Sequence, residues 1–71
     1  MRPYTFYLHD GVHPVPGFDF VHCRDDDDAL AHASRLLQRF EEYLFIEVYD
    51  GQRQRMRISR PLTAIRDEAA A

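Results

Sequence analysis

The sequence predicts an α+β fold in which two antiparallel β-hairpins form one four-stranded sheet and a single helix packs on one face of it. Four short segments alternate between apolar and polar residues, one central segment has apolar residues at three- and four-residue steps, and each half of the chain contains an Asp-Gly turn. A chain of 71 residues has room for one hydrophobic core. We therefore expect one domain over residues 1–62, followed by an Ala-rich, frayed segment over 63–71.

The first hairpin begins at residues 3–9. There Tyr4, Phe6 and Leu8 alternate with more polar residues, as in a strand with one buried face. Asp10-Gly11 then opens a turn-rich segment that continues through two prolines to Gly17. Residues 18–23 again indicate an extended strand, so the first hairpin has a long loop.

The helix is predicted to follow the acidic run at residues 25–28 and to extend to about Glu42 or Tyr43. Leu30, Ala33, Leu37 and Phe40 mark its apolar face. The acidic run lacks the Asp-x-Asp-x-Asp-Gly pattern of a calcium loop. Its carboxylates are better explained as helix caps, because they can accept the free amide protons of the first turn.

The second hairpin is predicted from strands at residues 44–50 and 53–59, joined at Asp50-Gly51. A two-residue loop at Asp50-Gly51 would place the apolar side chains of the first strand beside arginines of the second. A three-residue loop, Tyr49-Asp50-Gly51, instead places Leu44 and Ile46 on the same face as Met56 and Ile58. We therefore expect the three-residue loop.

These assignments give the sheet two faces. The core face collects apolar strand residues that the helix covers: Tyr4, Phe6, Leu8, Phe18, Phe20, Leu44, Ile46, Val48, Met56 and Ile58. The second face has no helix left to cover it and carries Tyr7, His9, Val21, Cys23, Phe45, Glu47, Tyr49, Arg53, Arg55 and Arg57. We expect any interaction surface to lie there, on Tyr7, Phe45, Glu47, Tyr49, Arg53, Arg55 and Arg57.

With these elements in order, the chain resembles a family of short, uncharacterised alphaproteobacterial proteins known only as a domain of unknown function. The resemblance spans most of residues 3–62 and rests on three motifs: residues 4–11 (Tyr-Thr-Phe-Tyr-Leu-His-Asp-Gly), the small-residue helix onset at residues 28–33, and residues 46–51 (Ile-Glu-Val-Tyr-Asp-Gly). It implies a bacterial protein with a β-β-α-β-β fold and no assigned activity. The last strand is more basic here than in that family.

Composition favours a protein that acts through a partner. The net charge is −3, no apolar run is long enough to span a membrane, and the opening residues lack the apolar run of a secretory signal. We therefore expect a cytoplasmic protein. Cys23 is the single cysteine, so a disulfide cannot support the small core. We expect self-association, as a homodimer, to supply the missing stability, without cofactor or membrane binding, and a further protein partner that the sequence does not name.

A different class of function is nucleic-acid binding. Aromatic and arginine side chains on one sheet face suit stacking on bases and contact with phosphates. The negative net charge opposes this interpretation, as does Glu47, which can neutralise Arg53 or Arg55 across the strands. We keep a small nucleic-acid-binding regulator as the alternative.

Metal binding and catalysis have less support in the sequence. His9, His13, His22 and Cys23 are suitable ligand types, but they lack paired Cys-x-x-Cys or His-Glu-x-x-His spacing, so no metal site is predicted. His22 and Cys23 are adjacent in a strand and point to opposite faces, so the histidine is badly placed to activate the thiol. We expect a protein that is not an enzyme.

Overall fold

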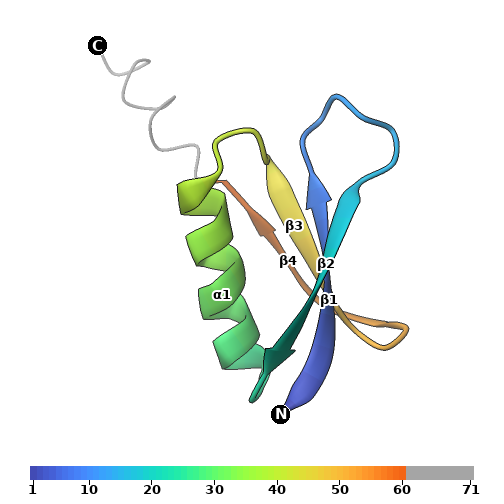
Figure 1. Cartoon of the computed structure of the whole chain (residues 1–71), viewed down its shortest axis with the longest axis vertical. Helices are drawn as coiled ribbons and strands as arrows, with labels where there is room; N and C mark the ends of the chain where they lie inside the picture. Colours follow the sequence, from blue (N-terminus) through green and yellow to red (C-terminus); the bar gives the residue numbers. More distant parts are fainter. Residues whose placement is uncertain (61–71) are drawn as a thin grey trace.

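The computed structural model describes residues 1–60, with five elements in the predicted order (Figure 1). They are β1 (Arg2–His9), β2 (Gly17–Cys23), α1 (Asp26–Arg39), β3 (Phe45–Asp50) and β4 (Arg53–Ser59). The expected frayed segment at residues 63–71 lies outside the described residues. The predicted α+β class and the order of elements are confirmed.

The four strands form one sheet in the order β2-β1-β3-β4, and every neighbouring pair is antiparallel. The two hairpins join where β1 pairs with β3, with Phe6 opposite Val48 and Leu8 opposite Ile46. The sequence left this order open. β1 and β3 lie in the centre because they carry the fully buried Tyr4, Phe6, Ile46 and Val48, and a central strand has neighbours on both sides.

The helix begins where the acidic run predicts. The Asp25 side chain accepts a hydrogen bond of 2.8 Å from the backbone N–H of Asp28, and Asp26, Asp27 and Asp28 occupy the first turn. The helix ends at Arg39, earlier than expected, because Phe40 adopts an extended conformation. Leu44 then donates a backbone hydrogen bond of 2.7 Å to the carbonyl of His9, which directs the chain back to the end of β1.

Small residues on the helix set its distance from the sheet. Ala29, Ala33 and Leu37 are buried at four-residue steps, and the alanines let the helix backbone approach the sheet closely. The prediction that Leu30 and Phe40 belong to the core is wrong, because they are 44% and 37% exposed. The buried face of the helix therefore begins at Ala29, one residue before the expected Leu30.

The faces of β2 are reversed from the prediction. Cys23 is fully buried beneath the helix and Val21 packs against the core, whereas Phe18 and Phe20 are 61% and 65% exposed. Register explains this, because Val21 lies opposite the buried Tyr4. β2 has apolar residues on both faces, with Phe18 and Phe20 on one and Val21 and Cys23 on the other. The apolar pattern of this strand therefore does not identify its buried face. Leu44, also expected in the core, is 48% exposed just before β3.

The second hairpin has the expected faces but a different turn. Asp50 pairs with Arg53, so the connection is the two-residue turn Gly51-Gln52, in which Gly51 has a φ of +64°. Val48 pairs with Met56 and the next residue, Tyr49, pairs with Gln54. Arg55 is therefore an extra residue in β4 and forms a β-bulge. The predicted three-residue loop is therefore wrong. The bulge restores the apolar pairing that the loop was expected to provide.

Phe6 and Phe18 allow a matched test of which sheet face is the core, because they lie on adjacent strands but differ in burial. Phe6→Ala is expected to lower the free energy of unfolding by about 3–5 kcal/mol, the usual cost of truncating a buried phenylalanine. Phe18→Ala is expected to change it by less than about 0.5 kcal/mol, as at an ordinary surface position. Urea unfolding of dilute protein measures both effects. Equal losses would contradict the observed faces.

Candidate interaction surface

The side of the sheet opposite the helix is an open face with a largely aromatic surface. Its main residues are Tyr7 and His9 on β1, Phe18 and Phe20 on β2, Phe45, Glu47 and Tyr49 on β3, and Arg57 on β4. The helix lies along the other side (Figure 1). No element of residues 1–60 covers the open face, as the count of one helix predicts.

Phe45 lies at the centre of a three-residue stack on the open face. The His9 ring lies parallel to it with the centroids 4.2 Å apart, and the Arg57 guanidinium is 4.2 Å from the Phe45 centroid. The two partners come from β1 and β4, the strands on either side of β3. Glu47 is held 2.8 Å from the Nε2 atom of His9. These contacts fix the ring and place a cation over its electron-rich surface.

Four further aromatic rings extend the open face toward β2. Tyr7 and Tyr49 meet edge to face at 5.3 Å, and Phe18 and Phe20 do so at 5.4 Å. Tyr7 is half-buried and lies opposite Phe18 in the β1–β2 register. The open face therefore carries aromatic side chains from the stacked Phe45 on β3 to Phe18 and Phe20 on β2, with Glu47 between Phe45 and Tyr49.

Phe18 and Phe20 are the site residues that sequence reasoning missed. From the sequence, both are expected on the core face, and Val21 and Cys23 are expected on the second face. One signal could have corrected the assignment. Cys23 lies two residues before the helix cap Asp25, and the helix begins its buried face with Ala29, so this end of β2 has to pass beneath the helix.

The three arginines predicted for the second face do not stay together. Arg57 lies on the open face, over Phe45. The bulge in β4 turns Arg55 to the helix side, where its guanidinium donates hydrogen bonds of 2.7 and 3.1 Å to one carboxylate oxygen of Asp26. Arg53 pairs with Asp50, which lies on the same side of the sheet as Tyr4. The predicted positions of Arg53 and Arg55 are therefore wrong, and the open face is less basic than expected.

Arg55 belongs to a polar network that fixes the start of the helix. The buried Tyr4 donates a hydrogen bond of 2.9 Å from its hydroxyl to Asp26 and accepts one of 2.8 Å from Arg2. Arg2 also lies 3.3 Å from Asp50. Hydrogen bonds from Arg55 and Tyr4 hold the pKa of the Asp26 carboxyl below its usual range, while burial raises the pKa of Tyr4.

The predicted metal-ligand types do not converge. His9 contacts Glu47, whereas His13 lies in the β1–β2 loop with its Nδ1 atom 2.6 Å from Asp10. Cys23 is buried on the helix side, away from His22. Within residues 1–60 no three histidine, cysteine or acidic side chains form a group able to hold a metal ion.

Cys23 and Asp10 are explained by their contacts within the fold. Burial raises the pKa of the Cys23 thiol, which disfavours the reactive thiolate. Asp10 accepts hydrogen bonds from the backbone N–H groups of Val12 and His13, and the bond from His13 is the main reason that its pKa lies well below the usual range. The aspartate therefore shapes the β1–β2 loop.

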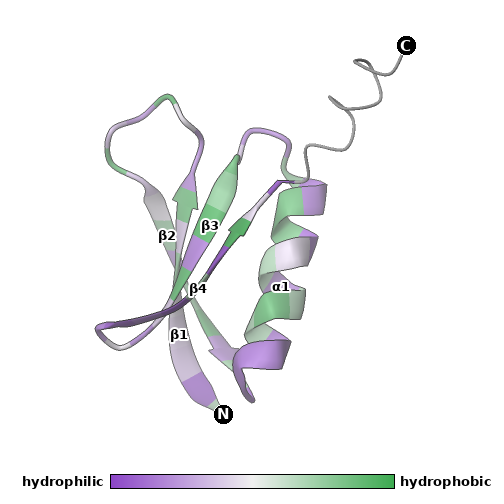
Figure 2. Cartoon of the chain, turned by 180° about the vertical axis from the view of Figure 1, so that it is seen from behind, coloured by the Kyte–Doolittle hydropathy of each residue, from purple (hydrophilic) through white to green (hydrophobic). Residues whose placement is uncertain are grey.

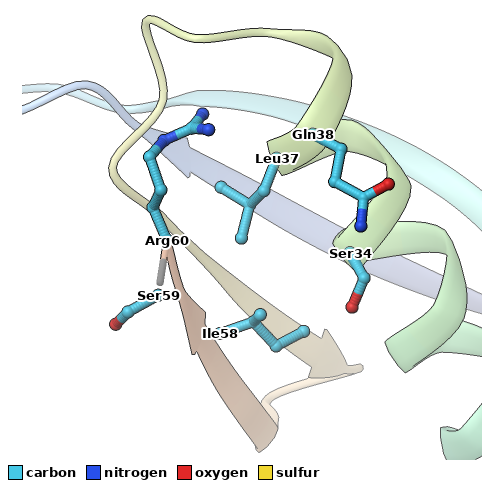
Figure 3. Close-up of a pocket in the computed structure, with 6 residues that line it drawn as sticks. All are labelled: Ser34, Leu37, Gln38, Ile58, Ser59 and Arg60. Carbon is cyan, nitrogen blue, oxygen red and sulfur yellow. The ribbon is translucent and has the colours of Figure 1, made fainter. Parts of the chain in front are cut away.

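A cavity of about 150 Å³ lies between the helix and β4, lined by Ser34, Leu37, Gln38, Ile58, Ser59 and Arg60 (Figure 3). Its charged side chain is already bound, because Arg60 donates hydrogen bonds of 2.6 and 2.8 Å to the carbonyl oxygens of Phe40 and Tyr43. Arg60 thus caps the carboxyl end of the helix. The cavity is explained by this packing and adds no group for chemistry.

Comparison with protein-family models, curated proteins and solved structures finds no match to this chain. The resemblance to the uncharacterised bacterial family stays a prediction. No helix of residues 1–60 is long and apolar enough to cross a membrane.

The Asp26 network predicts a defined pH dependence. The folded pKa of Asp26 is lowered, so its contribution to stability is present above the unfolded pKa of about 3.9 and is lost as pH falls through the lower folded value. Wild-type protein should therefore be more stable than Asp26→Asn at neutral pH, and the difference should shrink below about pH 4. Thermal unfolding across pH measures it.

Asp27→Asn is the matched control, because Asp27 occupies the same helical turn but is exposed. It should have the smaller effect. A difference between wild type and Asp26→Asn that stays constant down to about pH 2 would contradict the proposed role of the network.

Proposed function

We propose that this chain is a non-catalytic interaction module that self-associates as a homodimer through the β2 side of its open face. One observation carries the proposal: Phe18 and Phe20 are 61% and 65% exposed beside the half-buried Tyr7. Contiguous exposed aromatic surface is costly in water and is typical of protein interfaces. A second copy presents the same surface, as a two-fold dimer requires.

The small core supports the same proposal. The fully buried residues are few: Tyr4 and Phe6 on β1, Cys23 on β2, Ile46 and Val48 on β3, and Ala29 and Ala33 on the helix. Small domains with few buried large side chains gain stability from disulfides, metals or association. Cys23 is a free, buried thiol, and residues 1–60 contain no metal-binding group of three. Association is the remaining source of stability, and we propose that contact between the Phe18 and Phe20 rings of two copies supplies it.

Other classes of function have weaker support. A cysteine nucleophile would need access and a base, whereas Cys23 is fully buried and its pKa is raised by burial. Nucleic-acid binding would need several cations on the aromatic face. Of the three arginines expected to contact phosphates, Arg57 lies on the aromatic face. Arg55 is bound to Asp26, and Arg53 pairs with Asp50 on the helix side of the sheet. The remaining aromatic surface suits a protein partner better than phosphates.

The mass of the protein in solution tests the proposal. Sedimentation equilibrium at high micromolar concentration should give a dimer for the wild type and a monomer for the Phe18→Ser, Phe20→Ser double variant, because the variant loses the exposed rings but keeps the core. Leu30→Ser is the control, since Leu30 is an exposed apolar residue on the helix. It should remain dimeric. A wild-type monomer would overturn the proposal.

A further inference from the structure

The two edges of the sheet differ in how they resist pairing with another strand. β4 contains a bulge and carries Arg53, Arg55 and Arg57, and bulges and charges are the usual protection of an edge. Hydrophilic residues dominate the β3–β4 turn and the first part of β4 (Figure 2). This edge is therefore poorly suited to accept a further strand.

β2 lacks this protection. Its pairing with β1 has no bulge, from the pair Arg2 and Cys23 to the pair Leu8 and Gly17. With His22 neutral, Asp19 is the one charged side chain on β2. β1 pairs with one side of β2, and no strand of residues 1–60 pairs with the other. Backbone N–H and C=O groups along that outer side can therefore bond to another extended chain.

We infer that β2 pairs antiparallel with β2 of a second copy, around a two-fold axis at Phe20, so that the two sheets join into one of eight strands. The inference rests on the proposed self-association and specifies its geometry. The axis stands perpendicular to the sheet, because this arrangement keeps both helices on one side and both open faces on the other.

Closure favours a second β2 over β4 as the partner. Pairing β2 with β4 of another copy would leave a free edge at each end, and the contact would repeat without limit. The bulge and arginines of β4 oppose that contact. When β2 pairs with β2, the β2 edge of each copy is occupied by the other copy, so the assembly closes as a dimer.

The side-chain pattern selects the register. Residues of the two strands that face each other have to lie on the same face of the joined sheet, so Phe18, Phe20 and His22 pair among themselves. An axis at Phe20 places the two Phe20 rings opposite each other and Asp19 opposite Val21. An axis at Asp19 would instead oppose two carboxylates, which is unfavourable. An axis at Val21 would leave Phe18 beyond the end of the paired segment.

Disulfide trapping tests this geometry. Phe20→Cys should give a disulfide-linked dimer under mild oxidation, because the side chains of directly opposed residues lie close enough to bond. Thr5→Cys is the matched control, since Thr5 is the β1 neighbour of Phe20 on the same face. Two Thr5 positions would lie three strand spacings apart, about 14 Å, which is beyond disulfide reach. The buried native Cys23 remains in both variants.

Hydrogen exchange of the unmodified chain provides a second measurement. Amides of β2 should exchange more slowly at high than at low protein concentration, while those of β4 should not change. A dimer without Phe20 cross-linking and without protection of β2 would overturn edge pairing but retain self-association. A monomer by sedimentation would overturn both. Cross-linking at Thr5 but not at Phe20 would also overturn this geometry.

Discussion

The fold depends on one constraint: within residues 1–60, a single 14-residue helix covers one side of a four-stranded sheet. A helix is about 10 Å across, so it can shield the two central strands from one side only. Tyr4, Phe6, Ile46 and Val48 fill that side and are fully buried. The opposite side keeps its aromatic side chains without cover from residues 1–60. The open face is therefore a direct consequence of the element count.

The position of the helix determines which charged groups remain available. Alanines let it approach the sheet, and Asp26 bonds to Tyr4 at its start, while Arg60 bonds to the carbonyls at its end. The same contacts bind Arg55, which the bulge in β4 turns toward Asp26. The basic character of the last strand thus serves to attach the helix and to protect the β4 edge. The aromatic surface is left for the association that we propose.

Sequence periodicity predicts this fold well where a strand has one apolar face, as in β1, whose buried residues are the expected Tyr4 and Phe6. It fails for β2, where both faces are apolar and tertiary packing chooses the small Cys23 over Phe20. Of the residues expected to form the interaction surface, Tyr7, Phe45, Glu47, Tyr49 and Arg57 lie on the predicted face. Arg53 and Arg55 do not, because period-two alternation cannot anticipate a bulge. Strand order also depends on non-local pairing that local patterns do not contain.

The central claim is that the β2 side of the open face, which carries Phe18 and Phe20, forms the contact between copies. Isotope-filtered NMR of a mixture of labelled and unlabelled chains tests it most directly, because it detects only contacts between different molecules. The account predicts intermolecular signals from the Phe18 and Phe20 rings and none from Leu36 on the helix side. Signals confined to helix residues, or none in a concentrated sample, would contradict it.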